Sequence, residues 1–138
     1  MKEANAVRAV IDLYFDALFE SDVDKLQIAF HPSAKISGYS ANGAFNERDV
    51  KTFAEFVGSQ QPSARQQGAP RVLEVLSLEV AGRTAMALVR DDYLGLSYLD
   101  TLSFVEVDGR WSIYNKLFHI EGKARGNTRD RVATPTES

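Results

Sequence analysis

The sequence predicts a single α+β domain in which N-terminal helices cover a curved, mainly antiparallel sheet. Three observations lead to this fold class: an amphipathic pattern fills the first twenty residues, β-branched and aromatic runs fill the second half, and short turn sequences separate those runs. A chain of 138 residues is long enough for one domain with a sizeable core. We expect residues 1–120 to form this domain and residues 121–138 to form a charged tail without a periodic apolar face.

Two helices are expected at the N-terminus. Apolar residues recur at intervals of three and four positions through residues 3–20, which is typical of an amphipathic helix. A second, shorter helix is predicted at residues 22–30, where Ser21 and Asp24 have the spacing of a capping box. Pro32 prevents its continuation, because proline lacks the backbone N–H that a helix needs.

A small hairpin and a third helix should follow. Residues 34–39 alternate as a strand does, and the turn sequence at residues 40–43 predicts a return strand through residues 44–45. The third helix is predicted at residues 46–57, with Asn46 as its N-cap.

The rest of the domain should be strand. Residues 59–70 are polar and broken by proline and glycine, which is typical of a lid, a binding loop or a disordered link. The Asp108-Gly109 pair is a strong hairpin signal. Short connections of this kind predict an antiparallel meander, whose four strands are expected at residues 72–80, 83–94, 96–107 and 111–120.

Composition excludes several classes of partner and chemistry. A net charge of −3 and scattered basic residues argue against nucleic acid and anionic membranes. Without cysteine there is no disulfide, no thiolate nucleophile and no cysteine-based metal site. The first residues do not form the apolar core of a signal peptide, and no apolar run approaches the length of a membrane span. We therefore expect a cytoplasmic protein.

Several segments, in this order, resemble the nuclear transport factor 2-like superfamily. They are Asp12-Leu13-Tyr14-Phe15-Asp16-Ala17-Leu18 with Ser21-Asp22, Phe30-His31-Pro32-Ser33-Ala34, Asp100-Thr101-Leu102-Ser103-Phe104, and Asp108-Gly109-Arg110-Trp111-Ser112-Ile113-Tyr114-Asn115-Lys116-Leu117-Phe118. The closing hairpin is most similar to the putative lumazine-binding and SnoaL-like branch. The resemblance implies a cystatin-like topology, with three N-terminal helices on a cone-shaped, mixed or antiparallel sheet and a ligand cavity inside the cone.

The resemblance also implies a homodimer through the outer face of the sheet. No helix remains in the sequence to cover that face, which should be fairly apolar. We expect Tyr114, Lys116 and Phe118 to point outward and to form the dimer contact.

Strand alternation indicates which residues enter the cavity. If Trp111 points inward, an even step along the same strand also brings Asn115 and His119 inward. Asp100 joins them if it shares a face with Leu102, and a buried carboxylate there would need a partner or a proton. One bulge in either strand would reverse this alternation beyond it.

Two further residues are expected at the margin of the cavity. Tyr14 would reach it from the first helix, and His31 from the corner between helix and strand. The candidate catalytic residues are therefore Asp100, His119 and His31, and the candidate ligand-binding residues are Tyr14, Asn115 and Trp111. Each also has a structural interpretation, as a core or corner residue.

The sequence gives less support to an epoxide hydrolase-like site or a metal site. Arg90-Asp91-Asp92 resembles the Asp–Arg–Asp catalytic residues of epoxide hydrolases with this fold. Adjacent residues of a strand point to opposite faces of the sheet, however, so these three side chains cannot meet at one site. The two histidines have no helical pairing, so neither a metal nor another cofactor is expected.

Three functions remain open from the sequence. The first is a small-molecule-binding protein with its ligand inside the cone. The second is a dehydratase, cyclase or isomerase that uses histidine–aspartate acid–base chemistry. The third is a protein-interaction module whose cone is filled by side chains.

Overall fold

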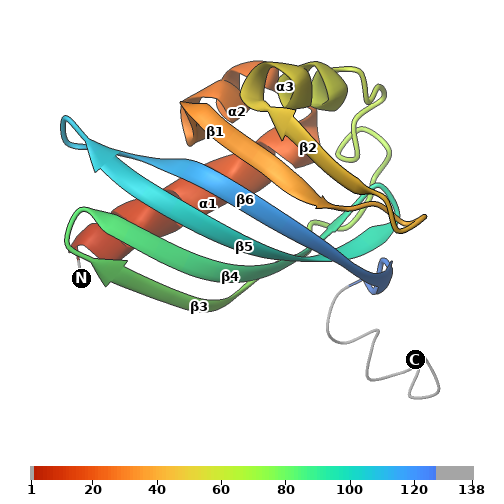
Figure 1. Ribbon diagram of the computed structural model, residues 1–138. Coiled ribbons are helices and arrows are strands. Elements are labelled where there is room, and N and C mark those ends of the chain that lie inside the picture. Colours follow the sequence, from red (N-terminus) through yellow and green to blue (C-terminus); the bar gives the residue numbers. More distant parts are fainter. Residues whose placement is uncertain (1, 127–138) are drawn as a thin grey trace.

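The computed structural model describes residues 2–126, in which three helices cover one face of a six-stranded sheet (Figure 1). The expected α+β class is confirmed. The elements are α1 (Lys2–Glu20), α2 (Val23–Ala29), β1 (Phe30–Tyr39), β2 (Phe45–Asp49), α3 (Val50–Gly58), β3 (Leu73–Ala81), β4 (Thr84–Tyr93), β5 (Leu96–Val107) and β6 (Arg110–Lys123).

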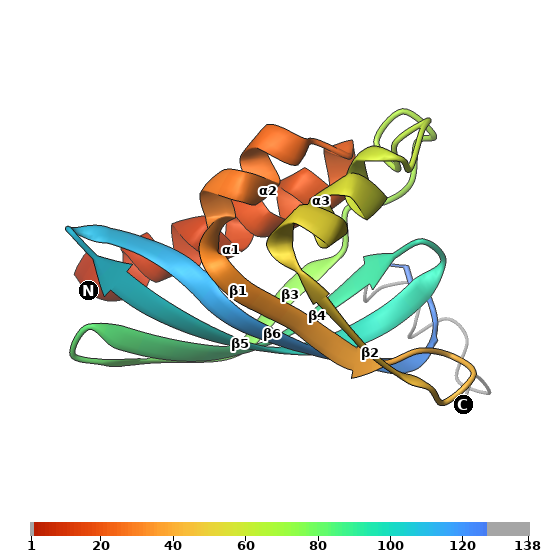
Figure 2. The same ribbon diagram turned by 45° about the horizontal axis from the view of Figure 1, so that its top comes forward.

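The sheet is mixed, with strand order β2-β1-β6-β5-β4-β3. Strands β3 to β6 form the predicted antiparallel meander, and β1 and β2 form the predicted hairpin. The single parallel pair joins β1 to β6. At the turn between β5 and β6, Asp108 and Gly109 have φ angles of 52° and 78°, as the hairpin signal predicts. Figure 2 shows the sheet curling round the helices.

The second helix begins at Val23, one residue later than predicted. Asp22, and not Ser21, is the N-cap, and its carboxylate accepts a hydrogen bond from the backbone N–H of Lys25 at 3.1 Å. Ser21 instead adopts a positive φ of 53° where the chain leaves α1.

The third helix also begins later than predicted. Residues 46–49 belong to β2, because they pair with β1 from Gly38 to Lys35 and gain their backbone hydrogen bonds there. The helix starts only after Asp49, whose carboxylate accepts the backbone N–H of Thr52 at 2.8 Å. The predicted cap, Asn46, therefore lies inside a strand.

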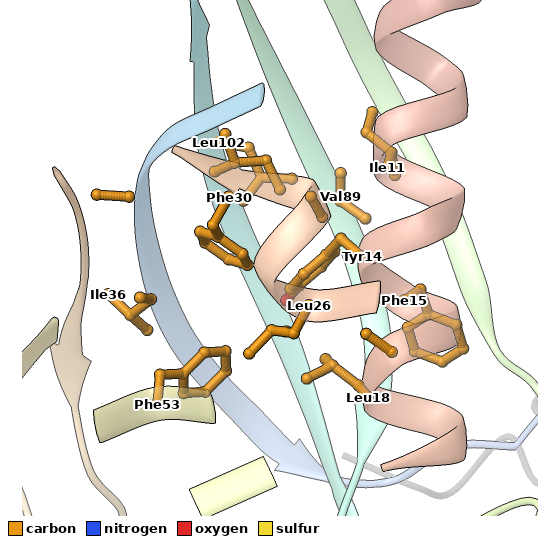
Figure 3. Packing of buried hydrophobic residues seen from close by; sticks show 14 of the residues in the cluster. Ile11, Tyr14, Phe15, Leu18, Leu26, Phe30, Ile36, Phe53, Val89 and Leu102 are labelled. Atoms are coloured by element: carbon orange, nitrogen blue, oxygen red, sulfur yellow. The ribbon is translucent and has the colours of Figure 1, made fainter. Parts of the chain in front are cut away.

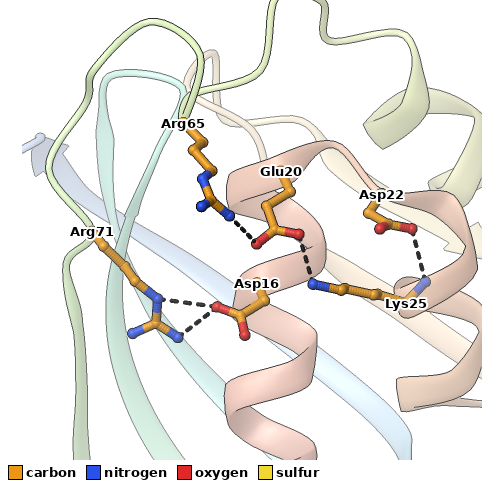
Figure 4. A network of polar contacts seen from close by, with 6 residues as sticks. All are labelled: Asp16, Glu20, Asp22, Lys25, Arg65 and Arg71. Atoms are coloured by element: carbon orange, nitrogen blue, oxygen red, sulfur yellow. Dashed lines mark hydrogen bonds and ion pairs between the residues drawn. The ribbon is translucent and has the colours of Figure 1, made fainter.

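The polar loop at residues 59–70 packs against α1 (Figure 4). The Arg65 backbone N–H donates to the Phe19 carbonyl at 3.0 Å, and its guanidinium meets Glu20 at 3.0 Å. Arg71, just beyond the loop, donates to Asp16 at 2.8 and 3.1 Å. The loop is thus an ordered connection held on the helix.

The last strand continues past the expected domain boundary at residue 120. Glu121 in β6 pairs with Arg90 of β4 at 2.9 Å, and the Ala124 backbone N–H donates to the Gly95 carbonyl at 2.9 Å. Part of the expected tail is therefore bound to the sheet. Residues 127–138 of that tail lie outside the described residues.

The hydrophobic core lies between the helices and the concave face of the sheet (Figure 3). Tyr14, Phe30 and Leu102 are among its fully buried side chains, and the Tyr14 and Phe30 rings meet edge to face at 5.7 Å. No helix among residues 2–126 is long and apolar enough to span a membrane.

Candidate functional site

A cavity of about 230 Å³ lies inside the cone, between the ends of α1 and α3 and the concave face of the sheet. Most of its wall is apolar or aromatic, which is typical of a small-molecule pocket. Asp91, Lys116 and Arg48 are its charged lining residues, and exposed Asn46 and Ala41 mark the end that faces solvent. The aromatic lining residues are Phe53, Phe56, Tyr93, Tyr98 and Phe118.

A bulge in β6 decides which side chains face this cavity. Ser103 of β5 pairs with Asn115, and the next residue, Phe104, pairs with Ile113, so Tyr114 is an extra residue in β6. The alternation reverses at this point. Lys116 is buried, with only 6% of its surface exposed, while Tyr114 is 45% exposed.

The predicted sharing of one face by Trp111, Asn115 and His119 is therefore wrong. Trp111 precedes the bulge and packs against the core, whereas Asn115 and His119 follow it and lie on the convex side. His119 is exposed. Trp111 does face the helices, but it lies beyond the cavity and does not line it.

His31 also lies outside the cavity. Its Nδ1 accepts the backbone N–H of Ser33 at 3.0 Å, and its ring packs on the exposed ring of Tyr114 at 5.2 Å. The structural interpretation of His31 as a corner residue accounts for these contacts. His31 packs on Tyr114, and His119, which pairs with Leu99 beside Asp100, points to the opposite face of the sheet, so neither histidine faces the Asp100 carboxyl group.

The same bulge changes the expected dimer face. Lys116 and Phe118 point into the cone, so of the three expected contact residues only Tyr114 faces outward. Met86 and Leu117, 54% and 47% exposed, lie on that convex face too. A homodimer across this face stays a prediction.

Asp100 lies on the concave face, as strand alternation predicts, but neither Asp100 nor Tyr14 lines the cavity. Asp100 is fully buried on this face with Leu102, and its Oδ2 accepts a hydrogen bond from the Tyr14 hydroxyl at 3.0 Å. Burial and the neighbouring negative charge of Asp100 raise the pKa of Tyr14 well above its ordinary value. Tyr14 thus remains a hydrogen-bond donor to Asp100.

Asp91 completes a buried pair of carboxyl groups that sequence reasoning missed. It lies on β4, where the neighbouring concave residue Val89 pairs with Asp100, so the two aspartates are diagonal neighbours on one face. Arg90 points to the opposite face and pairs with Glu121, as expected for adjacent strand residues. The pair could have been found by aligning β4 and β5 in antiparallel register.

The protonation state of Asp91 and Asp100 depends on their burial and on the charges beside them. Burial raises the pKa of Asp91 well above its ordinary value, and the negative charge of Asp100 raises it further. The positive charge of Lys116 opposes the increase. Asp91 Oδ2 and Asp100 Oδ1 are buried without a hydrogen-bond partner among the described residues. One proton on Asp91 supplies the missing donor, because two ionised carboxylates can only accept.

Lys116 places a positive charge in the same part of the cavity. Its Nζ lies 4.9 Å from the ring centres of both Tyr14 and Phe53 and 5.9 Å from that of Phe118. Within residues 2–126 it has neither a hydrogen bond nor an ion pair. The ammonium group is therefore held by aromatic rings and is available to a ligand.

Tyr93 adds a further polar group to the wall. Its hydroxyl is buried and has no hydrogen-bond partner in the described part of the chain. Burial raises the pKa of this phenol, so it enters the pocket as a neutral donor and acceptor. Together with the carboxyl pair and Lys116, it gives an apolar cavity a proton donor, a cation and a phenol.

Comparisons with known proteins place the chain in a family. Residues 2–119 match the family described as "Putative lumazine-binding". The chain is 27% identical over 117 residues to Aldolase FrzH from Cladobotryum sp., covering 85% of this chain and 90% of that protein. A crystal structure of a nuclear transport factor 2-like protein of unknown function from Silicibacter pomeroyi has a TM-score of 0.78 at 21% identity, covering 87% of this chain and 97% of that one. A similar protein from Methylobacillus flagellatus has a TM-score of 0.76 at 23% identity, covering 88% and 94%.

Proposed function

The chain belongs to the putative lumazine-binding family of the nuclear transport factor 2-like superfamily, and within it we propose an enzyme that transfers protons on a carbonyl compound bound inside the cone. The observation that carries the proposal is the buried pair of Asp91 and Asp100 beside Lys116. Two buried acidic groups cost folding stability, and such arrangements are common where proton transfer is needed. The aldolase name of the fungal relative agrees with this class of reaction.

Asp91 is the residue that touches the substrate, because it lines the cavity and holds the proton. One oxygen of its carboxyl group gives this proton to the substrate's carbonyl oxygen, and the other oxygen removes a proton from the adjacent carbon. The carbonyl compound thereby becomes an enol, and Asp91 ends in its original protonation state. Lys116 stabilises the negative charge that develops on the substrate oxygen.

An aldol addition extends the same proton transfers. The enol carbon forms a bond to the carbon of a second carbonyl group, whose C=O π bond breaks. Asp91 gives its proton to that second oxygen and takes back the proton of the enol O–H. Asp100 is a positioning residue in this scheme, since the Tyr14 hydroxyl fixes it and its negative charge keeps the proton on Asp91 until the substrate carbonyl accepts it.

A binding protein without turnover is the alternative, and hydrogen–deuterium exchange separates the two. The protein is incubated in D₂O with a panel of small ketones and aldehydes, and loss of the signal from protons next to the carbonyl is followed by NMR. We expect the wild-type protein to accelerate exchange for at least one member. Asp91→Asn should slow that exchange by about 10²–10⁴-fold, because an amide cannot exchange the proton in this way.

Asp12→Asn is the matched control, since Asp12 is a helix residue outside the cavity whose side chain is 44% exposed and whose carboxylate lies 3.6 Å from Arg8. This variant should exchange at the wild-type rate. Equal rates for the wild type and Asp91→Asn across the panel would overturn the enzymatic proposal.

A further inference from the structure

Arg48 lines the cavity from β2 and has no hydrogen-bond or ion-pair partner in residues 2–126. Its sequence neighbours Glu47 and Asp49 are acidic, yet both are engaged elsewhere. Glu47 accepts the Ser37 hydroxyl at 3.3 Å and lies 3.9 Å from Lys35, and Asp49 caps α3. Strand alternation separates Arg48 from these carboxylates, so a half-buried guanidinium faces the cavity uncompensated.

The side chain of Arg48 is held in place without its donors being used. Its guanidinium carbon lies 4.5 Å from the centre of the Phe56 ring, in a cation–π contact that leaves the N–H groups free. Its backbone is fixed by pairing with Ile36 of β1, another residue of the cavity wall. The planar guanidinium group of Arg48, held in this way, can bind a carboxylate through two parallel N–H···O hydrogen bonds.

The charged residues at the two ends of the cavity favour different groups of a ligand. The floor holds Asp91, beside the buried Asp100, and the negative charge of this carboxyl pair offsets the positive charge of Lys116 there. Arg48 lies near the solvent-facing end, where Asn46 of the same strand also lines the wall. An acidic group of a ligand is therefore favoured at the Arg48 end, where the guanidinium has no carboxylate beside it in the cavity wall.

We propose that Arg48 forms a subsite for an anionic group of the ligand, a carboxylate in particular, and so selects acidic substrates. This inference rests on the proposed function for the opposite end, where the reacting carbonyl group meets Asp91. The substrate class is then a carbonyl compound with an apolar middle and a carboxylate at its outer end.

The subsite is tested with two ligands of the same shape, naphthalene-2-carboxylate and naphthalene-2-carboxamide. Their binding is measured by isothermal titration calorimetry. The wild type should bind the carboxylate about tenfold more tightly than the amide, because only the carboxylate pairs with the guanidinium. Arg48→Gln should bring the two affinities within about twofold of each other, mainly by weakening the carboxylate. Arg48→Lys should retain part of the preference, since it keeps the charge but not the planar guanidinium group.

Arg83→Gln is the control, because Arg83 is an exposed arginine that pairs with Glu106 and lies outside the cavity wall. It should keep the wild-type preference. Equal or undetectable binding of both probes to the wild type, or an unchanged preference in Arg48→Gln, would overturn the subsite. Asp91→Asn separates this inference from the proposed function, since it should slow proton exchange as stated above and keep the preference for the carboxylate.

Discussion

Asp91→Asn should make the protein more stable at pH 7, raising its melting temperature by about 3–6 °C, which corresponds to about 1 kcal/mol in a domain of this size. The asparagine amide can donate to Asp100 as the protonated carboxyl group does, so the hydrogen bond is retained. It carries no ionisable proton, so the variant avoids the cost of keeping an acid neutral in a protein at neutral pH.

The pH dependence of this gain follows from the raised pKa of Asp91 in the folded protein. Below about pH 4 the Asp91 carboxyl group is protonated in both the folded and the unfolded chain, so its raised pKa does not lower the stability of the wild type. As the pH rises, the unfolded chain releases the proton and the folded chain keeps it, which lowers the free energy of unfolding. The stability gain of Asp91→Asn should therefore be small near pH 3 and should grow toward neutral pH.

Thermal unfolding of the two proteins between pH 3 and pH 8 measures this difference. Asp12→Asn again serves as the control, and it should follow the wild type because its carboxylate is exposed. A melting temperature of Asp91→Asn that is equal to or below the wild-type value at pH 7 would contradict an unfavourable buried acid.

Lys116→Met should lower the free energy of unfolding by about 1–3 kcal/mol, because it removes the cation whose charge offsets the buried carboxyl pair, although Lys116 makes no ion pair with either carboxyl group. Methionine keeps the unbranched apolar stem among Tyr14, Phe53 and Phe118, so little packing is lost. The loss arises because the negative charge shared by Asp91 and Asp100 then has no nearby cation.

A double-mutant cycle shows whether charge is the cause. Lys116→Met/Asp100→Asn removes one buried negative charge together with the positive one, and should be more stable than Lys116→Met alone. Urea unfolding of the four proteins gives the coupling energy. Lys35→Met is the control, because the Lys35 side chain is 57% exposed and its ion pair with Glu47 is long, at 3.9 Å. Additive effects of Lys116→Met and Asp100→Asn would show that Lys116 does not balance the carboxyl pair.

Most of the fold followed from local patterns in the sequence. The period of the first helix and the turn pairs between strands are local signals, and they predicted α1 and the meander. The start of α2 was predicted one residue early because the neighbouring residues Ser21 and Asp22 can each cap a helix, and the start of α3 was predicted four residues early at Asn46. Pairing with β1 then favoured a strand at residues 46–49 over a longer helix.

The site was predicted where strand alternation is regular and missed where it is not. Asp100 and Leu102 lie in an uninterrupted stretch of β5, so they share a face as regular alternation requires, although Asp100 does not line the cavity. The extra residue Tyr114 in β6 brought Lys116 inward and put His119 outside. No residue type marks this bulge in the sequence, since it depends on pairing with both β5 and β1.

The central claim is that Asp91 stays protonated at neutral pH inside the cone. NMR of protein labelled with ¹³C at the aspartate side-chain carboxyl carbons tests this claim directly, through a titration from pH 3 to pH 9 with Asp91→Asn used for assignment. We expect one aspartate signal, absent from the Asp91→Asn spectrum, to remain at its protonated position at pH 7 after the exposed aspartates have titrated. A spectrum in which every aspartate, Asp91 included, is ionised by pH 5 would contradict the account.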